Sequence, residues 1–121
     1  RSDSKILIIA TVNVGTYNAN FMYGQLVRGS THIFRGDAVG NRPRRSFMYY
    51  NGASDANEGM NATRTITHMD EPATTNATTY KIQIQCATTG YAYVNRSYRD
   101  TNTSEYDPRV ASSITVMEVC G

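Results

Sequence analysis

The sequence predicts an all-β protein, folded as an antiparallel β-sandwich of seven to eight strands. Apolar and polar residues alternate with a period of two in most apolar segments, and no segment keeps a helical period for three turns. Turn-forming residues cluster at intervals of roughly ten residues, as in sandwiches and jelly rolls. The composition agrees, because Thr is abundant and the nine Tyr outnumber the three Phe. The same alternation suits a jelly roll and an immunoglobulin-like sandwich, so both topologies stay open.

The stretch 79–119 shows this pattern most clearly. Residues 80–86 alternate strictly between apolar and polar, which predicts a half-buried strand. Gly90 supplies a tight turn into a return strand at 91–94, and the last strand is expected at 112–119. The apolar phase of the first and last of these strands should lie in the core: Tyr80, Ile82, Ile84, Ile114 and Val116.

The first half of the chain predicts five further strands, at 5–14, 21–28, 31–34, 45–50 and 64–69. The strand at 5–14 begins with apolar residues in both phases, which favours a central strand covered on both faces. Residues 15–20 are expected to turn. Residues 51–61 are rich in Gly, Asn, Ser and Asp and are expected to form an exposed loop tip.

Length and charge exclude several classes of protein. A chain of 121 residues predicts one domain over 1–121. The formal net charge of +2 is too small to indicate a nucleic-acid partner. The longest apolar run, at 6–10, is too short for membrane insertion. Because the chain starts at Arg1 and not at Met, we expect it to be the C-terminal part of a longer chain.

The two cysteines, Cys86 and Cys120, lack the clustered spacing of a metal site. They are either two small buried apolar residues or one disulfide. A disulfide would close a loop of about 35 residues, add ~3–4 kcal/mol of stability and indicate an oxidising, extracellular setting. Four glycosylation triplets fit an extracellular location, although such triplets also arise by chance in a chain rich in Asn and Thr; they start at Asn61, Asn76, Asn95 and Asn102.

No constellation of catalytic residues is apparent, so we expect a non-enzyme without cofactor or metal. The only histidines, His32 and His68, fall on separate predicted strands without a carboxylate or thiol at ligand spacing. Asp70 and Glu71 could be half of a general acid–base pair, but no second carboxylate is placed by spacing. Neither a nucleophile elbow nor a phosphate-binding glycine loop is present.

The turn at 40–45 is basic. Arg42, Arg44 and Arg45 could contact an anion such as phosphate or a sulfated glycan. The favoured interpretation is a solvated hairpin tip, because clustered surface arginines are common.

Several segments resemble a known family, namely 4–8, 26–30, 36–38, 72–75, 79–83, 94–97 and 111–119. In these segments the chain is similar to the C-terminal β-domain of many structural and fibre-like proteins of tailed bacteriophages, cyanophages especially. The resemblance covers nearly the whole chain. It implies a jelly roll similar in shape to the heads of tumour necrosis factor and C1q, often trimeric, with no catalytic residues.

The chain departs from that family at its start. A further strand usually precedes the segment 4–8, whereas only three residues precede it here. That strand is disordered, cut away or supplied by another chain. If it is missing, the backbone of Ile6, Leu7, Ile8 and Ile9 would form an open apolar edge that invites a partner strand. We therefore expect these residues to be an assembly edge and the chain not to be a stable monomer.

Three functions follow as expectations. The first is a non-enzymatic structural protein of a virion, a fibre, knob or capsid-decorating domain that forms a homotrimer and contacts a host-surface glycan or receptor. The second is a pilus-like extracellular filament subunit, an immunoglobulin-like sandwich completed by a donated strand. The weakest is a secreted carbohydrate-binding module that uses Tyr faces in place of the absent Trp. All three place the protein in a virion or outside the cell.

Overall fold

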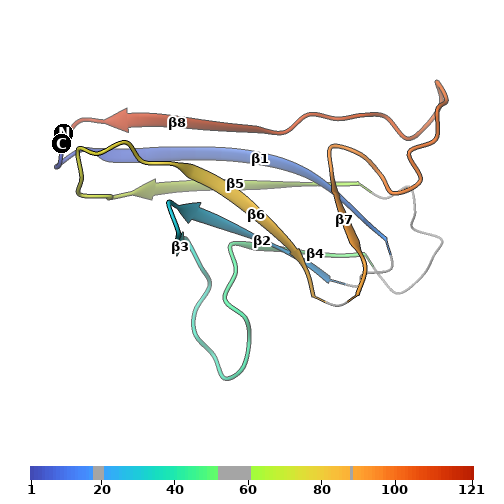
Figure 1. Ribbon diagram of the computed structural model, residues 1–121, viewed down its shortest axis with the longest axis horizontal. Helices are drawn as coiled ribbons and strands as arrows, with labels where there is room; N and C mark the ends of the chain where they lie inside the picture. The colour runs from blue at the N-terminus through green and yellow to red at the C-terminus, as the bar shows by residue number, and fades with distance from the viewer. Residues whose placement is uncertain (18–20, 52–60, 88) are drawn as a thin grey trace.

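The computed structural model describes residues 1–17, 21–51, 61–87 and 89–121, which form eight β-strands and no helix (Figure 1). The strands are β1 (Lys5–Tyr17), β2 (Phe21–Arg28), β3 (Thr31–Ile33), β4 (Phe47–Tyr50), β5 (Ala62–Asp70), β6 (Tyr80–Cys86), β7 (Tyr91–Val94) and β8 (Ser113–Val119). They lie in two antiparallel sheets, and the predicted β-sandwich is confirmed. Most of the expected loop tip at 51–61 lies outside the described residues.

The first sheet, the β1 sheet, is organised around its longest strand. β5 pairs along one side of β1, from Ile6 opposite Asp70 to Val14 opposite Ala62. The other side of β1 holds two strands end to end: β8 pairs with Lys5 to Thr11, and β7 with Val14 to Tyr17. The turn expected at 15–20 is therefore wrong at its start, since β1 continues to Tyr17 in order to pair with β7.

The second sheet, the β2 sheet, repeats this plan. β6 pairs along one side of β2, while β4 and β3 pair in succession along the other side. Each sheet is thus three strands wide, and β1 and β2 are their central strands. Both chain termini lie at one end of the sandwich, and the long connection from β7 to β8 lies at the opposite end (Figure 1).

The core lies between the two central strands. Even-numbered residues of β1 point inward, so Ile8, Ala10, Val12 and Val14 are buried, as the two-residue period requires. They pack in two clusters. Leu26 of the facing β2 and Ile66 of the neighbouring β5 belong to one, and Met22 and Tyr49 of the facing β2 sheet belong to the other. The strand at 5–14 is central, as predicted, but it is covered on one face only, because Ile9 on the other face is 37% exposed.

The core prediction for 80–86 and 112–119 is only half right. Tyr80, Ile82 and Ile84 of β6 are partly buried and pack against the core clusters. Ile114 and Val116 of β8 are exposed, although they occupy the inward phase of their strand. The physical reason is that the sandwich is open on the side where β6 and β8 face each other.

A buried ion pair joins the two sheets near the termini. Asp70, at the end of β5, accepts hydrogen bonds from Nη1 of Arg28 on β2 at 2.8 and 3.0 Å. It accepts another from the hydroxyl of Tyr80 on β6 at 2.7 Å. Burial, helped by this bond to Asp70, raises the pKa of the Tyr80 phenol. Since the Asp70 carboxylate is only 7% exposed and fully engaged, it closes the sandwich and is not placed for acid–base catalysis.

Candidate functional site

The most unusual strand of the structure is β8, because it buries neither of its faces. All seven of its residues are exposed. Ile114 is 43% exposed, Val116 45%, Met117 46% and Val119 40%. An ordinary strand of a sandwich turns one apolar phase into the core and the other, polar, phase to water. β8 instead presents apolar side chains to solvent on both sides.

The position of β8 explains this exposure. It pairs with β1 on one side only, and no other described strand pairs with its second side. Natural proteins protect such edges with Lys, Pro, bulges or inward-pointing charges. β8 contains no Lys or Pro. Its single charged residue, Glu118, lies in the inward phase opposite Ile6 and accepts a hydrogen bond from the amino group of Arg1 at 2.9 Å, so the edge carries a charge only near the termini. The part of the edge before Glu118 is open to another strand or surface.

Beside the free edge of β8 lies an apolar groove between the two sheets, here called the β6–β8 groove. Its volume is about 350 Å³. Its walls include Ile82 and Ile84 of β6, Ile114 of β8 and Val12 of β1, with Lys81 at the rim. The groove is the open side of the core, at the place where a wider sandwich would have further side chains.

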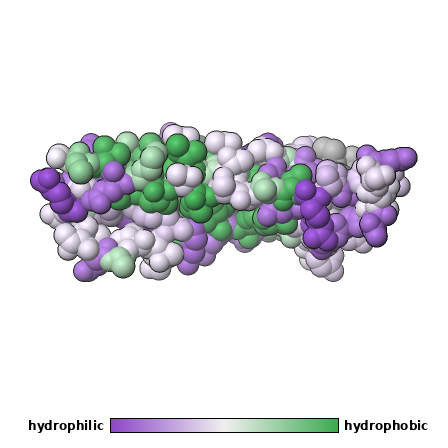
Figure 2. Space-filling model, turned by 90° about the horizontal axis from the view of Figure 1, so that it is seen from above, coloured by the Kyte–Doolittle hydropathy of each residue, from purple (hydrophilic) through white to green (hydrophobic). Residues whose placement is uncertain are grey.

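A second apolar surface covers the opposite face of the β1 sheet, here called the outer face. Directly paired residues share a face, so Leu7 lies beside Met69 and Met117, and Val119 beside Lys5. Ile9 continues the surface into a row of Thr on all three strands, formed by Thr11, Thr63, Thr65, Thr67 and Thr115. Among the described residues of this face only Lys5 is charged, and its Nζ pairs with Glu71 at 2.7 Å. Figure 2 views the molecule from above, onto the edge that carries β8, and shows hydrophobic residues along part of this edge.

The assembly edge expected at Ile6 to Ile9 is wrong as a backbone edge. β5 and β8 flank β1 on both sides there, and Ile8 is fully buried. The free edge is that of β8, one strand further out. Leu7 and Ile9 nevertheless belong to the exposed outer face. The signal for β8 was in the sequence, since 114, 116, 117 and 119 are apolar in both phases, as are 6–9.

The disulfide is also wrong. Cys86 and Cys120 are both free thiols. Cys86 ends β6 opposite Met22, whereas Cys120 follows β8 beside the termini, so the two lie at opposite ends of the sandwich (Figure 1). Burial raises the pKa of the half-buried Cys86 thiol, which makes it less reactive. The alternative of two buried apolar residues fails for Cys120, which is exposed.

The three arginines of the basic turn are each held by a different backbone carbonyl. Arg44 Nε donates to the carbonyl of Gly36 at 2.6 Å, and Arg42 Nη1 to that of Val39 at 3.4 Å. Arg45 donates to the carbonyl of Arg44 at 2.9 Å and lies 5.5 Å from the Tyr23 ring centroid. This arrangement fits the hairpin-tip interpretation, because the guanidinium groups brace the turn.

In the described ranges, no group of three or more His, Cys, Asp and Glu side chains is placed to hold a metal ion. His32 Nε2 lies 3.2 Å from Oε1 of Gln83, and the His68 ring packs against Phe34 with centroids 4.9 Å apart. A helix long and apolar enough to cross a membrane is not found in the part of the chain that the structure describes.

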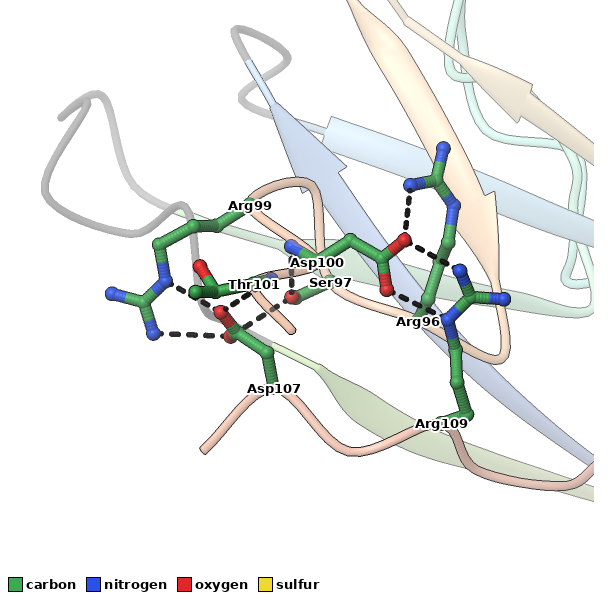
Figure 3. Close-up of polar contacts among 7 residues, drawn as sticks. All are labelled: Arg96, Ser97, Arg99, Asp100, Thr101, Asp107 and Arg109. Atoms are coloured by element: carbon green, nitrogen blue, oxygen red, sulfur yellow. Dashed lines mark hydrogen bonds and ion pairs between the residues drawn. The ribbon is translucent and has the colours of Figure 1, made fainter. Parts of the chain in front are cut away.

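The connection from β7 to β8 contains two carboxylates that sequence reasoning missed (Figure 3). Asp107 accepts hydrogen bonds from Arg99 at 2.7 and 3.0 Å and from the Ser97 hydroxyl at 3.0 Å. Asp100 accepts hydrogen bonds from Arg109 and Arg96. The bonds from Arg99 hold the pKa of Asp107 far below its usual range, and those from Arg109 lower the pKa of Asp100. Since both carboxylates stay ionised and engaged, this network fixes the shape of the loop and offers no proton donor.

The most prominent features of the described residues are therefore the free edge of β8, the β6–β8 groove and the outer face. Comparisons with known proteins add no identity: neither a protein-family model, nor a curated protein, nor a solved structure matches the chain.

Proposed function

We propose that this chain is a non-enzymatic structural subunit of a virion, a fibre, knob or capsid-decorating domain with a jelly-roll topology, which self-assembles into a homotrimer through the side that carries β8. The observation that carries the assembly is the exposure of Ile114, Val116, Met117 and Val119 on an unpaired edge strand. Contiguous exposed apolar surface beside an open edge usually marks an interaction site in a soluble protein. The virion and the trimer rest on the resemblance of the sequence to phage fibre domains.

The absence of catalysis is part of the proposal. Its support is that three carboxylates form ion pairs with arginines: Asp70 with Arg28, Asp107 with Arg99, and Asp100 with Arg109. A general acid or base must be able to change its protonation near neutral pH. Arginine-bound carboxylates remain ionised there.

The mass of the native protein tests the assembly. One subunit has a mass of 13.4 kDa, and light scattering over a dilution series should report three times this value until the oligomer dissociates. A chain that stays monomeric at every concentration and whose β8 amides are nonetheless protected from hydrogen exchange would contradict the proposal.

A second candidate is a filament subunit that receives a donated strand. The β6–β8 groove favours it, because an open apolar slot beside an unpaired strand is the form that donor-strand complementation fills. Electron microscopy separates the two. Particles of uniform size support the closed oligomer, and fibres of variable length support the filament, because only a contact that does not close can extend indefinitely.

A further inference from the structure

We propose that the β6–β8 groove of one copy receives the outer face of the β1 sheet of a second copy, so that β8 takes part in both contacts. This inference rests on the self-assembly proposed above and specifies how the copies meet. It makes the contact heterologous, which means that two different surfaces of the same chain bind each other.

The first argument is that β8 contributes side chains to two exposed surfaces of different shape. Ile114 lines the groove, and Val116 points the same way because it pairs with the buried Ile8. Met117 and Val119 point to the outer face, beside Leu7 and Lys5. A partner that covered only the groove would leave the flat face exposed, and the reverse also holds. A second copy can cover both surfaces, because it carries an apolar face for the groove and a groove for the apolar face.

The second argument is charge. Burying an unpaired charge is costly, so apolar surfaces associate best with surfaces that bring no unpaired charge. On the described part of the outer face the only charge is that of Lys5, already paired with Glu71 at 2.7 Å. The groove walls are apolar, and Lys81 at the rim is long enough to keep its ammonium group in water. Contact between the two surfaces therefore buries no unpaired charge, whereas a charged partner would bury its own charges without a counterion on either surface.

The third argument is area. Three strands of about nine residues cover a flat area of roughly 30 Å by 14 Å, or about 400 Å². A stable interface needs about 800 Å² per partner. A symmetric pair that used the face alone would bury only about 400 Å² on each copy. One groove-to-face contact buries no more than this, but in a ring every copy makes two such contacts and therefore covers both its face and its groove.

Chemical cross-linking tests this arrangement, because the sequence has two lysines and they mark the two surfaces: Lys5 on the outer face and Lys81 on the groove rim. We would assemble a mixture of ¹⁴N- and ¹⁵N-labelled chains and treat it with a long amine-reactive linker. Mass spectrometry then identifies links that join a light chain to a heavy one. The expected intermolecular link joins Lys5 of one copy to Lys81 of another.

Methionine oxidation gives a second readout on the unaltered chain. Met69 and Met117 lie on the outer face, and Met48 lies on β4 of the other sheet; all three are between 42% and 50% exposed in the single chain. Assembly should slow oxidation of Met69 and Met117 several-fold while Met48 oxidises at an unchanged rate. Equal rates for all three residues in the oligomer would overturn the inference.

The outcomes separate the two proposals. If the native protein forms an oligomer that yields only Lys5–Lys5 and Lys81–Lys81 links between chains, the groove-to-face contact is wrong and self-assembly stands. If the protein is a monomer at every concentration, no intermolecular link forms and both proposals fail.

Discussion

β1 and β8 are paired residue for residue, from Lys5 opposite Val119 to Thr11 opposite Ser113, yet they differ in the burial of their inward side chains. Both strands carry apolar residues in both phases. β1 has a strand on each side and the β2 sheet beneath it, and its inward residues are buried. β8 has a partner on one side only, and every residue is exposed. Composition makes a strand able to be buried, but its place in the sheet decides whether it is.

Truncating two directly opposed residues, one on β1 and one on β8, should give the largest difference in stability. Ile8→Ala removes a fully buried side chain at the centre of one core cluster and should cost about 2–5 kcal/mol of unfolding free energy. Val116→Ala, directly opposite on β8, should cost about 1 kcal/mol or less in the dissociated subunit, because half-exposed side chains lose little contact with water on folding. Urea denaturation of the dilute protein measures both. Equal losses would mean that β8 is as buried as β1.

Loss of the ion pair between Arg28 and Asp70 should have the next largest effect on stability. Asp70→Asn leaves Arg28 without its charge partner near the groove end lined by Tyr80, and should cost about 3 kcal/mol. Glu71→Gln is the matched control, because Glu71 is the next residue in the chain and pairs with Lys5 at the exposed surface. It should change stability by less than about 0.5 kcal/mol. Thermal or urea denaturation compares the two. A neutral Asp70→Asn variant would mean that the sheets do not depend on this pair.

Charge on the outer face should affect assembly and leave the subunit nearly unchanged. Met117→Lys places a charge on an exposed position, so the stability of the dissociated subunit should change by less than about 0.5 kcal/mol. In the oligomer it would bury an unpaired ammonium group and should raise the dissociation constant at least tenfold, about 1.4 kcal/mol. Thr31→Lys, on the exposed β3 of the other sheet, is the control. Analytical sedimentation measures the dissociation of both variants. Equal dissociation constants for Met117→Lys and Thr31→Lys would contradict a role of the outer face in assembly.

The smallest effect concerns acid. The pKa of Asp107 is lowered in the folded chain, so its network contributes stability above the unfolded value near 4, and this contribution is lost as the pH falls below it. Asp107→Asn should therefore lower the melting temperature slightly at neutral pH and make no difference in strong acid. β8 should keep its pairing with β1 in this variant, because the network lies in the preceding loop. A difference that grows on acidification would reverse the expected sign.

Local patterns revealed the elements but not their neighbours. The alternation at 80–86 and the two-phase apolar run at 5–9 placed β6 and β1, because side-chain direction in a strand depends only on sequence spacing. The exposure of Ile114 and Val116 could not be predicted in this way, since it depends on the position of β8 at the edge of its sheet and on the open side of the sandwich. The same holds for Arg28, Asp70 and Tyr80, which come from three strands and meet only when the sheets pack.

The sequence predicted an apolar edge strand without a partner, but at residues 6–9. In the structure, β8 pairs with these residues and is itself the apolar strand with a free edge. The Arg99–Asp107 and Arg109–Asp100 pairs were missed because their separations follow no strand or helix period. A search for oppositely charged residues within one long loop would have been the only signal.

The pairing of β1 with β8 also sets an order of events during synthesis. Of the eight strands, β1 leaves the ribosome before the others, and β8, which covers its edge from Lys5 to Thr11, follows after the other seven. Until then the backbone of Ile6 to Ile9 has no neighbour on that side, and a nascent chain with an apolar edge of this kind is prone to aggregate. The nascent chain therefore displays at Ile6 to Ile9 the open edge that the finished subunit carries on β8, and a chaperone that binds short apolar strands would have its target there.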